Sequence, residues 1–207
     1  MKNMIEVTII RHAETELNVV GVYQGRTDVS VGKRGMEELQ SAPAHPEVER
    51  VFVSPMLRTR QTAKTLFPNA EMVLIDELKE IDFGDFEGKT GEELDQDSSL
   101  HDAYWHWKQG GEDASCPNGE SIYEVAQRVT AAFDRIVDEA REGERVYVVA
   151  HGGIIMAMMS IFAGTMKDYF SFWIENLHGY HVIVDKNEWK CNRRFNSYKP
   201  YSALDEE

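Results

Sequence analysis

Short apolar runs rich in β-branched residues alternate along this chain with segments of helical period. Residues 5–10 and 145–150 are nearly continuous apolar runs, which is typical of strands buried on both faces of a sheet. Residues 121–141 repeat apolar side chains at three- and four-residue steps, the period of an amphipathic helix. Strands that alternate with helices favour an α/β fold, a three-layer sandwich in which a central, mainly parallel sheet is flanked by helices on both faces.

Other segments extend this scheme. We expect strands over residues 50–54 and 72–75, and helices over residues 56–67 and 154–162. Near the end of the chain, residues 180–185 and 188–195 are expected to form two short strands joined by a hairpin turn at Lys186-Asn187.

The chain length of 207 residues suits a single domain over residues 1–207 that needs no disulfide to stabilise its core. Its two cysteines, Cys116 and Cys191, lie far apart without a paired spacing, so neither a zinc site nor a disulfide framework is indicated. Residues 84–117 are the least regular segment. We expect an insertion there, at about residues 84–120.

The charge balance excludes several classes of function. Lys plus Arg number 22 and Asp plus Glu number 36, which gives a net charge of −14. An acidic surface opposes binding to nucleic acid, because that binding replaces phosphate counterions with cationic side chains. No signal peptide and no apolar run of about 18 residues is present, so we expect a cytoplasmic protein that does not bind membranes. Any anion must be bound in a small local pocket.

Four functional side chains follow predicted strands. His12 and His151 each come directly after a strand, Arg58 opens the helix that follows another, and Glu80 lies after the strand at 72–75. In α/β sheets, ligands bind beyond the carboxyl ends of the strands. A single histidine in such a place is more often structural, and Glu80 alone could be a solvated charge, but together these residues indicate a site. Because a helix advances about 100° per residue, Arg60 should point away from it.

Arg11, His12, Arg58 and His151 would form a compact cationic cup that suits a phosphoryl group. A neutral imidazole can attack phosphorus and hold the phosphoryl group covalently. Glu80, if protonated, could then donate to the departing oxygen and afterwards activate a water molecule.

Four segments resemble the histidine phosphatase superfamily, which includes the cofactor-dependent phosphoglycerate mutases. They are residues 11–18 (RHAETELN), 54–63 (SPMLRTRQTA), 80–88 (EIDFGDFEG) and 150–153 (AHGG), in the family's order. Two departures are Ala13, where Gly is common, and residues 29–32 (VSVG), which replace the usual Pro-Leu-Thr.

The resemblance implies a phosphoric monoester hydrolase of the histidine acid phosphatase type, with His12 as the phosphorylated nucleophile and Glu80 as the proton donor. It implies that Arg11, Arg58 and His151 hold the phosphoryl group. By the same resemblance, Asn18, Gln24, Gly25 and Gly152 contact the transferred phosphate or the substrate. No metal and no organic cofactor is implied. The expected partner is a small phosphate ester, and a homodimer is left open.

Two alternatives to a phosphatase stay open. One is a mutase, although the segment of about 40 residues from Glu80 to Ser121 is nearer in length to the phosphatase branch. The other is a catalytically silent module that binds phosphate ligands, against which the intact His12 and Glu80 argue.

The substrate itself is not selected by the sequence. Tyr104, Trp105, His106 and Trp107 could form an aromatic wall over the organic part of a substrate, or Tyr104 with Trp107 or Trp105 could only anchor the insertion to the core. His178 and His181 could line the mouth of the pocket or lie on the surface.

Overall fold

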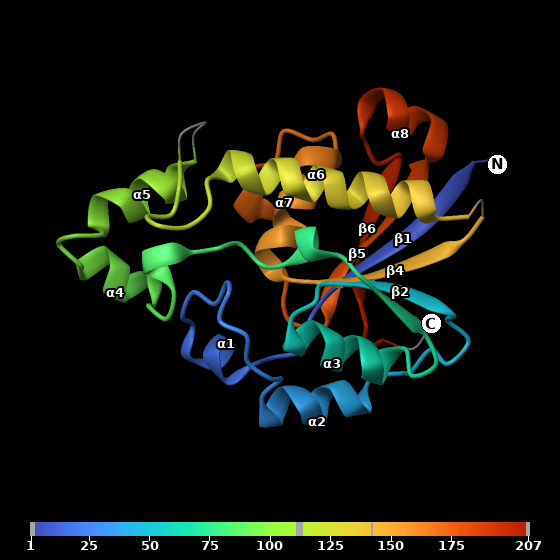
Figure 1. The fold of residues 1–207 in the computed structure, drawn as a ribbon, viewed down its shortest axis with the longest axis horizontal. Helices are drawn as coiled ribbons and strands as arrows, with labels where there is room; N and C mark the ends of the chain where they lie inside the picture. Colours follow the sequence, from blue (N-terminus) through green and yellow to red (C-terminus); the bar gives the residue numbers. More distant parts are fainter. Residues whose placement is uncertain (1–2, 111–113, 142, 206–207) are drawn as a thin grey trace.

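A computed structural model describes residues 3–110, 114–141 and 143–205. Its described residues form a sheet of six strands in the order β3-β2-β4-β1-β5-β6 (Figure 1). Strands β3, β2, β4 and β1 run parallel to one another, while β5 pairs antiparallel with β1 and β6 pairs antiparallel with β5. The predicted α/β fold with a mainly parallel sheet is confirmed.

The elements have the following bounds in chain order: β1 Met4–Arg11, α1 Glu16–Val20, α2 Lys33–Ser41, β2 Arg50–Val53, α3 Leu57–Leu66, β3 Glu71–Leu74, η1 Asp76–Leu78, η2 Gly84–Phe86, α4 Gly91–Gln96, α5 His101–Gln109, α6 Ile122–Glu139, β4 Arg145–Ala150, α7 Gly152–Phe162, η3 Tyr169–Phe172, β5 His178–Asp185, α8 Lys186–Asn192 and β6 Ser197–Ser202. The η elements are single turns of 3₁₀ helix.

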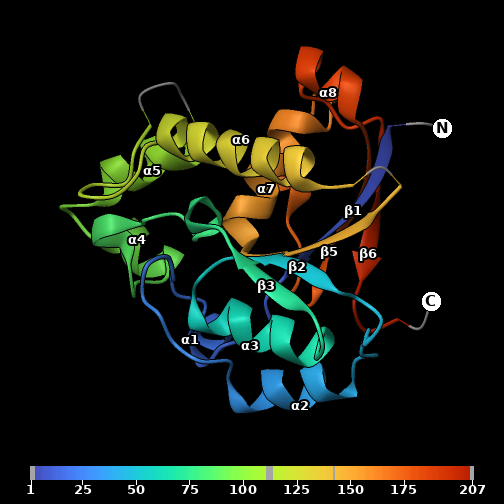
Figure 2. The same cartoon turned by 45° about the vertical axis from the view of Figure 1, so that its right-hand side comes forward.

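Helices cover both faces of the sheet, with α6 and α7 on one side and α2 and α3 on the other (Figures 1 and 2). Successive side chains of β1 point to opposite faces of the sheet, so this strand contributes to the core on both sides. Ile5, Val7 and Ile9 enter the core under α6 and α7, whereas Ile10 enters the core under α3. Because β1 is buried on both faces, it reads in the sequence as a nearly continuous apolar run.

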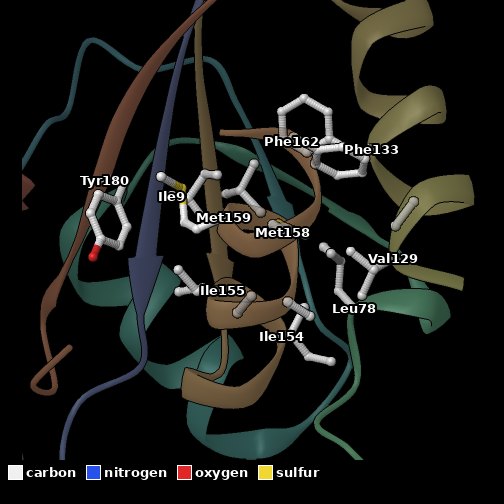
Figure 3. Packing of buried hydrophobic residues seen from close by; sticks show 14 of the residues in the cluster. Ile9, Leu78, Val129, Phe133, Ile154, Ile155, Met158, Met159, Phe162 and Tyr180 are labelled. Atoms are coloured by element: carbon white, nitrogen blue, oxygen red, sulfur yellow. The ribbon is translucent and has the colours of Figure 1, made fainter. Parts of the chain in front are cut away.

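Helix α6 begins at a capping box in which the Ser121 side chain accepts from the Glu124 amide and the Glu124 carboxylate accepts from the Ser121 amide. Its buried face includes Val129 and Phe133, and the Phe133 ring lies beside Phe162 of α7 in Figure 3. Helix α7 is apolar on nearly all sides because it lies between α6 and the sheet. No helix in the described part of the chain is long and apolar enough to cross a membrane.

The predicted hairpin at Lys186-Asn187 is wrong. Asp185 ends β5 and caps a helix, since its side chain accepts from the amides of Asn187 and Glu188. Residues 186–192 therefore form α8, whose Trp189 is buried against Phe133 and Phe162. The later strand that pairs with β5 is β6, farther along the chain.

The segment at residues 84–117 is more regular than expected. It contains η2, α4 and α5, and α4 begins at a second capping box, Thr90 with Glu93. Tyr104 and Trp107 are buried in the same core cluster as Ile9 of β1, whereas Trp105 is 42% exposed. The sequence left open whether these aromatic side chains cover a substrate or anchor the segment to the core. Tyr104 and Trp107 anchor the segment to the core.

Candidate active site

The four predicted side chains lie at the carboxyl ends of the four parallel strands. His12 follows β1, Arg58 is the second residue of α3 after β2, Glu80 follows β3 and η1, and His151 follows β4. In the register of β1 and β4, Arg11 lies opposite Ala150, so the two histidines are the next residues on neighbouring strands. The His12 amide donates to the Ala150 carbonyl at 3.0 Å, and the two imidazole centroids are 5.2 Å apart.

The hydrogen bonds of His12 determine which nitrogen carries its proton. Nδ1 lies 2.7 Å from the Ala13 carbonyl oxygen, which can only accept, so Nδ1 is protonated. The Nε of Arg58 donates to the Nε2 of His12 at 3.3 Å. Nε2 is therefore the unprotonated nitrogen, and its lone pair is the nucleophilic one.

Arg58 is a fully buried guanidinium held by backbone carbonyls. It donates through its two terminal nitrogens to the oxygens of Gly25 and Thr27, each at 3.0 Å. Arg60 is exposed, as the helical geometry predicts. The Thr62 hydroxyl donates to the Arg58 carbonyl at 2.8 Å and accepts from the Ala13 amide at 2.9 Å, which ties α3 to the loop that carries His12.

His151 is fully buried beside His12. Its Nε2 lies 2.8 Å from the Ser54 hydroxyl oxygen, and its Nδ1 has no hydrogen-bond partner within the described residues. Burial lowers the pKa of His151 well below its ordinary value, and the Arg58 charge adds to this effect. Burial and the charges of Arg58 and Arg11 likewise lower the pKa of His12. Both imidazoles are therefore neutral at pH 7.

The Glu80 carboxyl group is held by two backbone donors. The Ile81 amide donates to Oε1 at 2.9 Å, and the Gly153 amide at the start of α7 donates to Oε2 at 3.0 Å. Burial raises the pKa of Glu80 even though these two donors and the charges of Arg58 and Arg11 lower it. A Cβ at position 153 would lie 2.5 Å from Oε1, so this close approach requires glycine.

A cavity of about 620 Å³ opens in front of His12. Of the predicted site residues, it is lined by Arg11, His12, Asn18, Gln24, Glu80 and Gly152. Arg58, His151 and Gly25 are not among its lining residues. Arg58 reaches the reactive centre through the Nε2 of His12, while Gly25 contributes the carbonyl that holds Arg58.

Polar groups in this cavity have unused donors. The Oε1 of Gln24 accepts from the Thr15 hydroxyl at 2.7 Å and from the Asn18 side chain at 3.5 Å. Its Nε2 is buried without a hydrogen-bond partner among the described residues, and the same is true of the Nε of Arg11. The other end of the Arg11 guanidinium donates to the Ile174 carbonyl at 2.7 Å, which fixes the side chain. These donors could bind the oxygens of an anion.

Two residues of the site, Ser54 and Asn176, were not predicted from the sequence. Ser54 follows β2 directly, and this position is the signal that also identified His12. Thr62 lies one helical turn after Arg58, and the helical period correctly places it on the same side of α3. Asn176 donates from Nδ2 to the His12 carbonyl at 2.8 Å and to Asn18 Oδ1 at 3.3 Å, and no local pattern indicates this role because it lies before the antiparallel strand β5.

The two late histidines have different positions. His178 lines the cavity. His181 lies within β5 opposite Thr8 of β1, with its Nδ1 3.1 Å from the Thr8 hydroxyl. It is therefore located along the strands and away from their carboxyl ends, where His12 lies.

Comparison with known proteins shows the family to which the chain belongs. Adenosylcobalamin/alpha-ribazole phosphatase of Escherichia coli is 26% identical over 90% of this chain and 90% of its own length. Phosphoserine phosphatase 1 of Hydrogenobacter thermophilus is 28% identical over 87% of this chain and 86% of its own length. The crystal structure of phosphoglycerate mutase from Bacillus anthracis shares the fold, with a TM-score of 0.75 at 20% identity over 97% of this chain and 93% of that one. The sequence model of the histidine phosphatase superfamily (branch 1) matches residues 7–197, and the chain belongs to this superfamily.

Proposed function

We propose that this chain is a phosphomonoesterase of the histidine acid phosphatase type, which hydrolyses a small phosphorylated metabolite through a phosphohistidine on His12. The observation that carries the proposal is the state of His12. Its Nδ1 proton is held by the Ala13 carbonyl, so Nε2 carries the lone pair, which accepts from Arg58 in the free protein, and His12 lines the same cavity as Glu80.

In the first step, Nε2 of His12 attacks phosphorus and the bond from phosphorus to the ester oxygen breaks. Glu80, in its protonated form, gives its proton to the departing alkoxide, so that an alcohol leaves. The Nε–H of Arg58, which donates to Nε2 in the free protein, then donates to a phosphoryl oxygen. The unused donors of Arg11 and Gln24 stabilise the other oxygens.

In the second step, the Glu80 carboxylate removes a proton from a water molecule that attacks phosphorus. The bond between phosphorus and Nε2 breaks, inorganic phosphate leaves, and Glu80 is protonated again for the next cycle. The raised pKa of Glu80 supports both roles, because it brings the proton affinity of the carboxyl group closer to neutral pH.

The relatives support a phosphate ester as the class of substrate, but they do not select one compound within that class. One is named for adenosylcobalamin and alpha-ribazole phosphates and another for phosphoserine, at similar identity to this chain. We further propose that residues 1–207 act as one domain in which the segment at 84–120 is an insertion. Its Leu94, Tyr104 and Trp107 share a core cluster with the sheet.

The test is hydrolysis of 4-nitrophenyl phosphate by the intact chain, with His12→Ala as the main variant. We expect His12→Ala to lose at least about a thousandfold in kcat, because the covalent route is removed. His101→Ala, a substitution of a half-exposed histidine on α5, is the matched control and should keep full activity.

The intermediate can be tested separately. Rapid quenching during turnover should trap phosphate on His12 in a form that survives alkali and is lost in acid, as expected for a phosphoramidate. A folded protein that hydrolyses no phosphate ester in a broad panel would contradict the proposal. Conversion of 3-phosphoglycerate to 2-phosphoglycerate that is faster than phosphate release would instead identify a mutase.

A further inference from the structure

The cavity in front of His12 is lined by several charged side chains besides the reacting groups. Beyond the reacting groups, its lining includes the carboxylates of Glu14, Glu38 and Glu175. Among the described lining residues, Arg11 and Arg34 are the only Lys or Arg side chains. Three carboxylates therefore line the cavity that would receive the substrate.

Carboxylates accompany both guanidinium groups of the lining, although the Arg34 side chain is 78% exposed. Arg11 is the one that faces the phosphoryl position beside His12. The Nε of Arg34 is 3.6 Å from Glu14 Oε1, and Glu38 lies one helical turn after Arg34 on α2. Glu14 and Glu175 also lie within electrostatic reach of Arg11, since both raise its pKa against the larger effect of burial. A carboxylate on the substrate would thus meet three carboxylates, while the charge of Arg34 beside them is screened by solvent because its side chain is 78% exposed.

Apolar and aromatic side chains complete the lining. Tyr23, Phe83, Met156 and Ile174 contribute to it, and Trp173 is 61% exposed. An indole face attracts apolar groups and cations. We propose that Glu14, Glu38, Glu175 and Trp173 restrict the substrate to phosphate monoesters whose organic part is uncharged or cationic, and that they exclude esters bearing a carboxylate.

This inference rests on the proposed phosphatase activity, and it makes a sharper claim about the same site. It predicts that the organic group is selected by its charge before its shape. Two pairs of probes isolate that charge. Glycerol 3-phosphate and 3-phosphoglycerate differ in a hydroxymethyl group against a carboxylate, and phosphoethanolamine differs from phosphoserine by the added carboxylate.

The experiment compares kcat/KM for phosphate release within each pair. We expect the ester without a carboxylate to be favoured by at least about tenfold in both pairs, since like charges at close range oppose binding. The double variant Glu38→Gln/Glu175→Gln should reduce this ratio severalfold. The matched control is Glu37→Gln/Glu71→Gln, which removes the same charge from exposed positions outside the cavity lining and should keep the wild-type ratio.

Different results overturn the two proposals. If 4-nitrophenyl phosphate is hydrolysed but the carboxylate esters are used equally well or better, the specificity inference alone is overturned. It is also overturned if both double variants change the ratio to the same extent. If no ester is hydrolysed, the proposed function fails, and Kd values measured for the four probes on the folded chain still decide the inference: equal values within each pair overturn it, and weaker binding of the carboxylate member supports it.

Discussion

Acid should destabilise this protein through its two buried imidazoles. Burial lowers the pKa of His12 and His151 well below the ordinary value of 6.5. Below that value the unfolded chain binds protons on both side chains, whereas the folded protein binds them only at much lower pH. The unfolded state thus takes up more protons, and the free energy of unfolding falls as the pH is lowered through 6.5 towards the folded-state pKa values.

The size of the effect follows from linkage. Between pH 7.5 and 5.5, each imidazole that stays neutral in the folded state contributes a loss of about 1.4 kcal/mol, or about 2.7 kcal/mol for the two. Glu80 acts in the opposite direction, because its raised pKa lets the folded state take up a proton before the unfolded state does. The loss should therefore be larger in Glu80→Gln than in the wild type.

The measurement is urea denaturation at pH 7.5 and pH 5.5 for the wild type, Glu80→Gln, and Glu80→Gln combined with His151→Gln. Removing one buried imidazole should halve the loss that is seen in Glu80→Gln. His101→Gln, which changes a half-exposed histidine, should leave the loss unchanged. Equal stability at the two pH values in Glu80→Gln, or a loss that is undiminished after His151 is replaced, would refute the reasoning.

Two further substitutions test how the site is held. Gly25→Ala should lower the free energy of unfolding by about 1–3 kcal/mol and reduce kcat, because a Cβ there would clash with the Ile81 carbonyl oxygen and displace the Gly25 carbonyl that accepts from Arg58. The control is Gly88→Ala, at a positive φ in open space, which should lower the free energy of unfolding by about 1 kcal/mol through backbone strain and keep kcat. Asn176→Ala should lower the free energy of unfolding by about 1–2 kcal/mol, since the His12 carbonyl loses its hydrogen-bond donor, and it should lower kcat more than it raises KM. An unchanged kcat in a destabilised protein would assign Asn176 a purely structural role.

The parallel part of the fold could be predicted because its strands and helices have strong periodic patterns. Strand β4 begins and ends where the sequence places it, and α6 differs by one or two residues at each end. The rule that ligands bind at the carboxyl ends of such strands then brought His12, Arg58, Glu80 and His151 together correctly.

The remaining elements depend on interactions that a local pattern does not reveal. The sequence predicts a strand at residues 188–195, where the structure has helix α8. Trp189 of α8 and Phe195, which follows the helix, are buried against Phe133 of α6 and Phe162 of α7, and such distant partners leave no local pattern. Helices α1, α2, α4 and α5 are only five to nine residues long, so each shows little of the helical period, although the sequence contains a capping box at Thr90. Asn176 joins the site through tertiary contacts alone.

The position of β1 in the sheet has a consequence for the order in which the chain folds. Its neighbours on the two sides are β4 and β5, which begin at Arg145 and His178, more than a hundred residues later. Until those strands have been synthesised, the backbone groups of β1 have no partner and its apolar side chains have no core to enter. We therefore expect His12 to reach its working position only late in synthesis, and expect truncated chains that end before residue 145 to expose an unpaired, apolar strand that is prone to aggregate.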